Sequence, residues 1–304
     1  CRGRGVIMQE NTQYTKGQLA VKRAFSARDL VVLAITFFVF FLLSAGYFIV
    51  DYFTSEYFNQ YASPVTIVFS LIGIAIGALI FFCFIIAIGM FIIRMQRQIM
   101  LGNALQIEYS AYAWLRDWAN EVSADLELPK VEIFVTQDPV INAYAFGFIR
   151  PYTIVLHSGA IRYMTHQELK TVVVHEMAHI KYGHTLASLY LLPFTPIPAI
   201  GAFSSWISGF WQRRAELTAD RLALMYMANS ELVKESLIKV HVGPDVASSM
   251  NDVARQWQQY VAERPMNRFV QTFSTHPFLV RRLSHLDKWK SVVEPEATGV
   301  PKAR

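Results

Sequence analysis

Two long runs without a charged residue constrain the fold of this chain more than any other feature. Residues 30–50 and 65–93 contain no Asp, Glu, Lys or Arg. The apolar core of a bilayer is about 30 Å thick and takes about 20 helical residues, so each run is long enough to cross it. The first run is too long for the core of a cleavable signal peptide, and the second run follows it directly. We therefore expect two transmembrane helices within residues 30–93, with core helices of a soluble protein as the alternative.

Basic residues lie before the first run and after the second run, but not between the two runs. The loop between the runs, residues 51–63, has no Lys or Arg, whereas the outer flanks carry Lys16, Lys22, Arg23, Arg28, Arg94 and Arg97. By the positive-inside rule, the N-terminus and everything after the second run lie on the cytoplasmic side. We expect an integral, multi-pass protein of a plasma or inner membrane, with its polar domain in the cytoplasm.

Net charge and cysteine content agree with that placement. The formal net charge is +5, and basic residues beside the apolar runs suit anionic lipid head groups. We therefore expect the lipid bilayer, and no nucleic acid, as a partner. Cys1 and Cys83 are the only cysteines, so the disulfide framework of small secreted proteins is not indicated.

A histidine pair at helical spacing predicts a metal site in the polar part of the chain. His175 and His179 are four residues apart, so on a helix they project from the same face. Two neutral imidazoles at this spacing can bind one Zn²⁺, and Glu176 between them can serve as general base. Thr165 to Glu168 reads as a capping box that begins this helix, and Gly183 is a plausible stop. The alternative is an ordinary amphipathic helix that contains two histidines.

A catalytic zinc site usually has three protein ligands and one open position, so a third ligand is needed. His184 follows His179 at the wrong spacing for the third histidine of a metzincin, and we expect it to be a helix-end residue. Glu216 and Asp220 lie four apart in a helical pattern and are better candidates. One carboxylate can bind the metal while the other orients a ligand histidine through its second ring nitrogen. Taken alone, such a pair is more often a solvated helix face.

Together these motifs resemble the membrane zinc metallopeptidases of the HtpX heat-shock protease and CAAX prenyl endopeptidase type. The resemblance rests on His175–His179 and on Arg213-x-x-Glu216-x-x-Ala219-Asp220. Two further segments match in order, Asn142-Ala143-Tyr144-Ala145-Phe146-Gly147 and Ser274-Thr275-His276-Pro277 with Arg282 beyond it. The likeness extends over residues 100–290 and is closest to the HtpX type.

The resemblance assigns a role to each matching residue. It implies that His175, His179 and Glu216 bind one Zn²⁺ per chain, that Glu176 is the catalytic base, and that Asp220 supports a ligand histidine. It places Asn142 and Ala143 beside the substrate backbone, and His276 and Arg282 in the cleft. We expect those last two residues to be candidate donors to the oxyanion of the transition state.

The segment Thr185–Trp211 departs from the HtpX pattern, in which a second hydrophobic pair lies between the zinc helix and the third ligand. It has no charged residue, but a single crossing would place Glu216 on the opposite side of the membrane from His175. Two crossings would need about 40 residues. We expect a hairpin or re-entrant element at the cytoplasmic interface, with an apolar loop packed under the domain as the alternative.

The expected fold is mainly α with a small β-sheet, an α+β gluzincin-like protease domain preceded by two N-terminal transmembrane helices. We divide the chain into a cytoplasmic segment (1–29), a transmembrane hairpin (30–93), a metallopeptidase domain (94–292) and a flexible tail (293–304). Within the domain we expect a mostly helical stretch over 94–126, strands at 131–135 and 153–156, and helices over 225–260 that break near Gly243.

The expected function is that of a membrane-bound zinc endopeptidase that hydrolyses peptide bonds of membrane or membrane-proximal proteins in quality control. Two alternatives remain, a catalytically inactive zinc-binding membrane adaptor and CAAX-type processing of prenyl proteins. Glu176 argues against the adaptor, because a purely structural zinc site has no use for a base that is not a ligand.

Overall fold

The computed structural model describes residues 15–61, 63–146, 150–191, 198–272, 274 and 276–293. Most of these residues are helical, and one small four-stranded sheet accompanies them, which confirms the expected mainly α fold with a small sheet. Almost all of the expected tail, residues 294–304, and the first half of the expected N-terminal segment lie outside the described residues.

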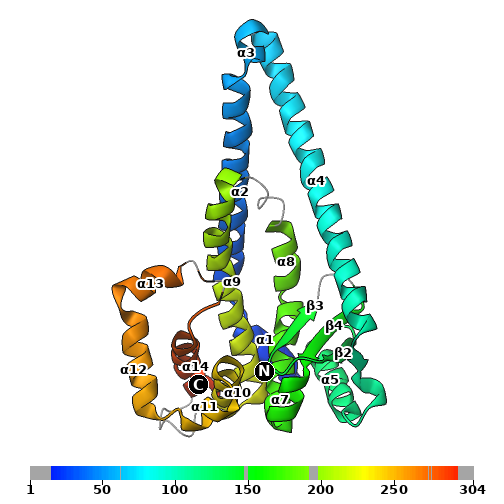
Figure 1. Ribbon diagram of the computed structural model, residues 1–304, viewed down its shortest axis with the longest axis vertical. Coiled ribbons are helices and arrows are strands. Elements are labelled where there is room, and N and C mark those ends of the chain that lie inside the picture. Colours follow the sequence, from blue (N-terminus) through cyan, green and yellow to red (C-terminus); the bar gives the residue numbers. More distant parts are fainter. Residues whose placement is uncertain are drawn as a thin grey trace, which may run out of the picture.

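Two long antiparallel helices project from the rest of the molecule (Figure 1). They are α2 (Ala27–Thr54) and α4 (Pro64–Gly102), joined at the tip by α3 (Glu56–Tyr61). α4 begins at a capping box between Ser63 and Thr66, and large apolar side chains such as Phe69 and Phe91 are exposed along it. Within the described residues, α4 is the one helix whose length and hydropathy meet the requirements of a membrane span.

The sheet has the strand order β1-β2-β4-β3. Its strands are β1 (Leu105–Gln106), β2 (Val131–Thr136), β3 (Ala143–Phe146) and β4 (Tyr152–His157). β2 and β4 pair in parallel with Ile133 opposite Ile154, and the other two pairs are antiparallel. β2 and β4 confirm the two expected strands, whereas the short edge strand β3 is an addition to the expectation.

The mostly helical pattern expected over residues 94–126 is confirmed at both ends of that range, but the structure interrupts it in the middle. α4 ends at Gly102, where the Asn103 side chain donates to the Ile99 carbonyl oxygen at 3.0 Å. Leu105 then pairs with Val135 of β2, so strand pairing replaces the helix. A 3-10 turn (Ile107–Tyr109) and α5 (Ala113–Asp125) follow. Ile107 is buried in the 3-10 turn and Leu115 in α5, whereas Leu105 of β1 is 58% exposed. The apolar side chains of this stretch therefore belong to three separate elements.

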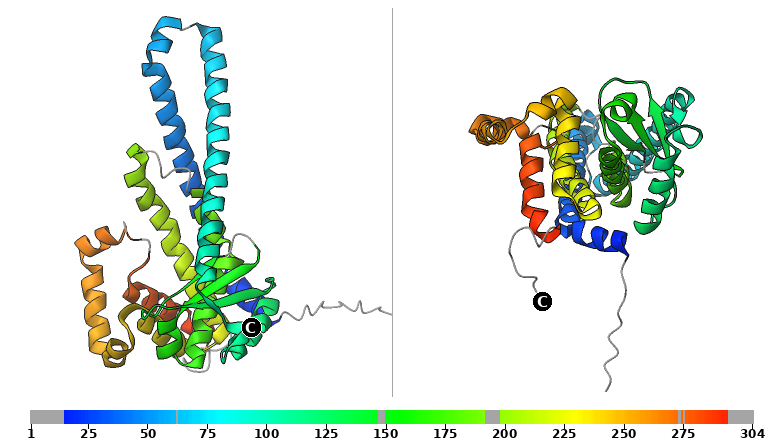
Figure 2. Two further views of the ribbon diagram at one scale, coloured as in Figure 1. Left: turned by 45° about the vertical axis from the view of Figure 1, so that its right-hand side comes forward. Right: turned by 90° about the horizontal axis from the view of Figure 1, so that it is seen from below.

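The remaining helices surround the sheet and the core. In chain order they are α1 (Lys16–Ala24), α6 (Ser158–Tyr163), α7 (His166–Lys181), α8 (His184–Leu191), α9 (Pro198–Met227), α10 (Ser230–Val242), α11 (Pro244–Ser249), α12 (Asp252–Glu263), α13 (Pro265–Gln271) and α14 (Leu279–Val293). The helices expected over 225–260 are confirmed: they are the end of α9, α10, α11 and most of α12, and the chain breaks at Gly243. The two views of Figure 2 show α12 and α13 set apart from the other helices.

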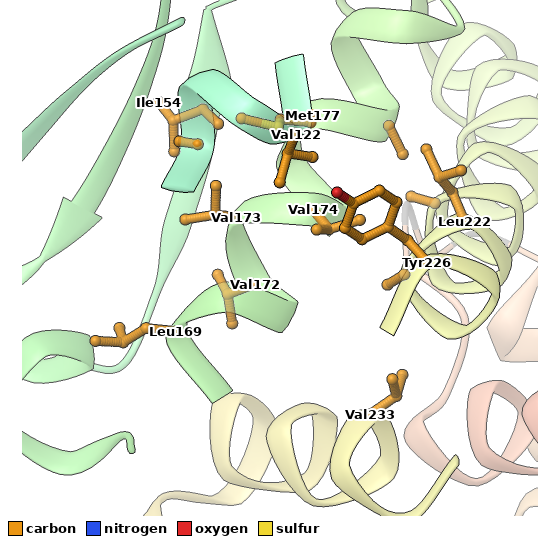
Figure 3. Packing of buried hydrophobic residues seen from close by; sticks show 14 of the residues in the cluster. Val122, Ile154, Leu169, Val172, Val173, Val174, Met177, Leu222, Tyr226 and Val233 are labelled. Atoms are coloured by element: carbon orange, nitrogen blue, oxygen red, sulfur yellow. The ribbon is translucent and has the colours of Figure 1, made fainter. Parts of the chain in front are cut away.

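The core lies between α7, α9 and the sheet (Figure 3). Val173, Val174 and Met177 of α7 are fully buried in one cluster with Leu222 and Tyr226 of α9. Burying a large aliphatic side chain stabilises a fold by about 1.5–3 kcal/mol. α7 is therefore held rigidly from one side, and its opposite face carries the histidine pair.

The base of α2 is fixed to α9 by a group of ion pairs. Asp29 in the first turn of α2 accepts hydrogen bonds from the Nε of Arg214 at 2.7 Å and from the hydroxyl of Thr218. Arg221 lies 3.5 Å from the same carboxylate. These three partners lie within two turns of α9, so α2 and α9 are joined at a defined register.

α8 and the first half of α9 form the two arms of a hairpin on either side of residues 192–197, which lie outside the described part of the chain. Gly183, at φ +67°, turns the chain from α7 into α8. Ala187 of α8 and Trp211 of α9 are buried with Phe82 of α4 and Leu33 of α2. The hairpin therefore packs against the lower part of the α2–α4 pair, and its depth in a membrane stays a prediction.

Candidate metal centre and catalytic cleft

The helix α7 presents the histidine pair because both of its ends are fixed. At its N-terminus the Thr165 hydroxyl accepts from the Glu168 backbone N–H at 3.3 Å, and the Glu168 carboxylate accepts from the Thr165 N–H at 2.7 Å. At its C-terminus Gly183 adopts the left-handed conformation that ends the helix. Both the expected capping box and the expected stop are confirmed.

Three donor atoms converge where α7 faces α9. The Nε2 atoms of His175 and His179 are 3.2 Å apart. Glu216 of α9 places one carboxylate oxygen 3.5 Å from His175 Nε2 and the other 3.6 Å from His179 Nε2. Tetrahedral ligands at about 2.1 Å from a zinc ion lie roughly 3.4 Å from one another. The spacing and the two-nitrogen, one-carboxylate donor set therefore fit Zn²⁺ with one position left open.

Asp220, one turn after Glu216, holds the ring of His175. Its Oδ1 lies 3.1 Å from His175 Nδ1, and the residue is only 2% exposed. A proton on Nδ1 leaves the Nε2 lone pair directed at the other two donors. Burial alone would lower the pKa of His175, but hydrogen bonds to Asp220 and Glu216 outweigh it and raise that pKa to about 10. Metal binding must therefore displace a proton from this ring.

His184 holds the ring of His179 in the same way, a role that was not expected from the sequence. The Nδ1 atoms of the two rings are 3.0 Å apart, and His184 is buried with its ring edge-on to Trp211. Burial lowers the pKa of His179 to about 4 and that of His184 to about 3, so both rings are neutral. A neutral His184 can accept the Nδ1–H of His179 and leave His179 Nε2 as a ligand. The sequence does contain a signal for this contact: His184 directly follows Gly183, and a glycine that ends a helix can turn the next side chain back toward the last helical turn.

Glu176 is buried beside His175, His179 and Glu216, and its pKa is higher than that of an ordinary glutamate. Burial raises its pKa to about 7, although the charge of His175 opposes the shift. Glu216 behaves differently: burial acts to raise its pKa, but Arg282 and His175 hold it well below the ordinary range. Glu216 is thus anionic and suited to bind a cation, whereas Glu176 is a carboxylate that can gain and lose a proton near neutral pH.

Arg282 of α14 braces both carboxylates of α9. Its Nε and Nη2 donate to the two oxygens of Asp220 at 2.7 and 2.6 Å, and Nη2 lies 3.2 Å from Glu216. Burial acts to lower the pKa of Arg282, but Asp220 and Glu216 raise it further above its ordinary value. The guanidinium group therefore stays charged and bridges two anions. Its expected contact with an oxyanion stays a prediction.

His276 lies at the exposed rim of the site. Its Nδ1 is 3.4 Å from Glu216, and 67% of its side chain is exposed. The hydrogen bond to Glu216 raises the pKa of His276. An exposed imidazole above the ligand set is suitably placed to meet a substrate, and its expected role as an oxyanion donor stays a prediction.

A cleft of ≈ 520 Å³ runs past the donors. β3 forms one wall with Asn142 and Ala143, and the Asn142 side chain accepts the Ala143 N–H at 2.9 Å. The opposite end is largely apolar and lies between α7, α9 and α10, with Val172, Val233 and Leu237 among its lining residues. All the expected site residues line this one cleft: Asn142, Ala143, His175, Glu176, His179, Glu216, Asp220, His276 and Arg282. The α10 wall had no recognisable signal in the sequence.

The sequence is similar to a family of peptidases and to two individual members of known families. The model of the family described as peptidase family M48 matches residues 110–205 and 196–290. The chain is 29% identical to the plastoglobule-localized metallopeptidase 48 of Arabidopsis thaliana, a chloroplastic protein, over 66% of this chain and 64% of that one. It is 31% identical to a protease HtpX homolog of Persephonella marina over 39% of this chain and 42% of that one.

The crystal structure of S. mikatae Ste24p superimposes with a TM-score of 0.44 and 16% identity, covering 73% of this chain and 64% of that one. The chain thus spans less than two thirds of the length of each of these three proteins.

Proposed function

This chain belongs to peptidase family M48, and we propose that it is a membrane-embedded zinc endopeptidase acting on membrane or membrane-proximal proteins in quality control. The observation that carries the proposal is the convergence of His175, His179 and Glu216 at tetrahedral spacing beside a buried base. The names of the Arabidopsis and Persephonella relatives, a metallopeptidase and a protease, support the same activity.

Each of the residues that line the cleft has a separate role in the proposed peptide hydrolysis. A zinc ion, when bound, lowers the pKa of water and polarises the scissile carbonyl. Glu176, with its pKa near neutrality, removes the proton from the attacking water and returns it to the leaving amine. His276 at the rim supplies a donor where negative charge develops on the carbonyl oxygen. Asp220 and His184 keep the two ligand rings fixed during the reaction.

The edge strand β3 is suited to hold an extended polypeptide. Among the described strands it pairs only with β4, so its other edge faces the cleft. A peptide laid along that edge can form main-chain hydrogen bonds irrespective of its sequence. This arrangement favours a protease that accepts varied, unfolded segments, as quality control requires.

The membrane part of the proposal rests on the shape and composition of the N-terminal half. We take α2 and α4 as two spans, and the α8–α9 hairpin as an element that enters the cytoplasmic face without crossing. The hairpin packs on the lower part of both long helices, because its Trp211 shares a cluster with Leu33 of α2 and Phe82 of α4. The catalytic domain then lies on the side of the basic flanks, directly under the bilayer.

The test is Glu176→Gln in the purified full chain. This variant should retain zinc, because its ligands are intact, but should lose peptide hydrolysis by about 10²–10⁴-fold, the usual contribution of a general base. Fluorogenic casein reports the hydrolysis, and elemental analysis reports the zinc. Glu235→Gln, the same change at an exposed position of α10, is the matched control. A zinc-free wild type, or unchanged turnover in Glu176→Gln, would refute the proposal.

A further inference from the structure

The helices α12 and α13 form an arm, residues 252–271, that leaves large apolar side chains uncovered. Met266 is 70% exposed and Phe269 is 61% exposed, and Trp257 and Tyr260 of α12 are exposed as well. Soluble surfaces rarely gather so many large apolar side chains on one short element. We propose that α13 docks on the lipid surface of the membrane and binds anionic head groups. This inference rests on the proposed membrane location of the chain.

The level of α13 in the molecule is fixed by its contacts with α9. Arg213 of α9 donates to the carbonyl oxygens of Thr272, at 2.8 Å, and Ser274, just after α13. Gly209 approaches the same segment so closely that a side-chain carbon there would lie 3.0 Å from the Ser274 carbonyl oxygen. The segment 185–211 has no charged residue, and Arg213 is the first one after it. α13 is therefore attached to α9 where that helix changes from apolar to charged, the level expected of a membrane surface.

The direction of the arm agrees with this level. α12 runs from α11, at the end of the domain far from the α2–α4 pair, toward the side from which that pair projects (Figure 1). α13 lies at the end of the arm nearest to that side, and the left view of Figure 2 shows the same arrangement. The arm and the two long helices therefore reach toward the same bilayer.

The chemistry of α13 matches a lipid head-group layer. Residues 264–272 contain Arg264 and Arg268 and no Asp or Glu. The Arg264 guanidinium lies over the ring of Tyr260, 5.1 Å from its centroid. Apolar side chains that enter the acyl boundary beside cations that meet phosphate are the pattern of interfacial helices. A second copy of this chain would not require the cations, so we choose the lipid surface.

Docking of α13 has a consequence for the active site. Only four residues separate Gln271, the last residue of α13, from His276, whose imidazole lies 3.4 Å from Glu216. Arg213 of α9 holds two of those residues, Thr272 and Ser274, through their carbonyl oxygens. A membrane that holds α13 thus also restrains the His276 loop above the metal ligands.

Fluorescence quenching by labelled lipids tests this docking in the full chain. An NBD dye is attached to one cysteine at a time, in a background with Cys1→Ser, after reconstitution into phosphatidylcholine–phosphatidylglycerol nanodiscs. Three positions are compared: native Cys83 in α4, Phe269→Cys in α13, and Ser249→Cys at the end of α11, the last two with Cys83→Ser. Doxyl groups placed near the head group or deep in the acyl chain are the quenchers. Zinc content shows that each variant is folded.

The dye at position 269 should lose fluorescence, more with the shallow quencher than with the deep one, whereas the dye at 249 should lose none. Arg264→Gln with Arg268→Gln, or discs of phosphatidylcholine alone, should reduce the loss at 269. No quenching at 269 in discs that quench Cys83 would overturn the docking but leave the proposed function intact. No quenching at Cys83 would overturn the membrane placement itself. A signal at 269 that follows the number of chains per disc, with no lipid quenching, would identify a second copy and refute the lipid surface.

Discussion

Replacing Asp220 by Ala should reduce both the stability of the metal-free protein and its affinity for zinc, for two separable reasons. The stability effect comes from Arg282, which is 5% exposed and donates two hydrogen bonds to Asp220. Removing one partner of a buried ion pair costs about 3–5 kcal/mol, because the other charge is left unpaired. Glu216 remains 3.2 Å from Arg282, so we expect the lower end of that range, about 3 kcal/mol. At roughly 2–4 °C per kcal/mol, Tm falls by about 6–12 °C.

The effect on zinc comes from His175. Without the carboxylate 3.1 Å from its Nδ1, the ring loses the partner that fixes its orientation and the position of its proton. Loss of such a partner usually lowers metal affinity by about 10–100-fold, which is about 1.4–2.7 kcal/mol. Tm is measured on zinc-stripped protein in detergent, and zinc affinity by competition with a fluorescent chelator.

A double variant separates the two effects. Adding Arg282→Met to Asp220→Ala removes the unpaired guanidinium, so Tm should recover most of the loss while zinc affinity stays low. Recovery of both quantities would mean that Asp220 acts only by neutralising Arg282. Wild-type zinc affinity in Asp220→Ala itself would refute the orienting role of Asp220.

Three further outcomes follow from the contacts of the site and of α2. Glu216→Ala should lower zinc occupancy sharply in elemental analysis, and full occupancy would exclude Glu216 as a ligand; Glu235→Ala is its matched control. His184→Ala should weaken zinc binding by about 10–100-fold, whereas His184→Asn, which keeps an acceptor, should weaken it less. If His184→Ala and the wild type bind zinc equally well, His184 does not position His179. Asp29→Ala should destabilise the junction of α2 and α9 by about 1–3 kcal/mol and expose it to limited proteolysis, whereas Asp51→Ala at the other end of α2 should not.

The residues of the candidate metal centre could be identified from the sequence because their spacing is mostly local. Two histidines four residues apart share a helix face whatever surrounds them, and so do Glu216 and Asp220. The capping box at Thr165 and the stop at Gly183 are also local signals, and the structure has both. The approach of α7 to α9 is not local and followed from the family resemblance.

The features that were missed depend on contacts between distant segments. β3 is four residues long and is a strand because it pairs with β4 along Ala143 to Phe146, which no periodicity within the strand reveals. Similarly, the chain leaves the helical path after Gly102 because Leu105 pairs with β2. His184 was compared with ligand spacings and set aside. Its role depends on the left-handed turn at Gly183, which brings its ring back against His179.

The single helix α9 connects the base of α2 to the candidate metal centre. Along α9, Gly209 meets the segment after α13, Arg214 binds Asp29 of α2, Glu216 meets the histidine pair and Asp220 orients His175. These positions span twelve residues, a rise of about 17 Å at 1.5 Å per residue, and a helix of that length bends little. A shift of α2 relative to the domain would therefore move Glu216 and Asp220 together. The ion pairs of Asp29 with Arg214 and Arg221 and the contacts of Glu216 with the histidine pair therefore lie on one rigid element, so the α2–α9 junction and the candidate metal centre are mechanically connected.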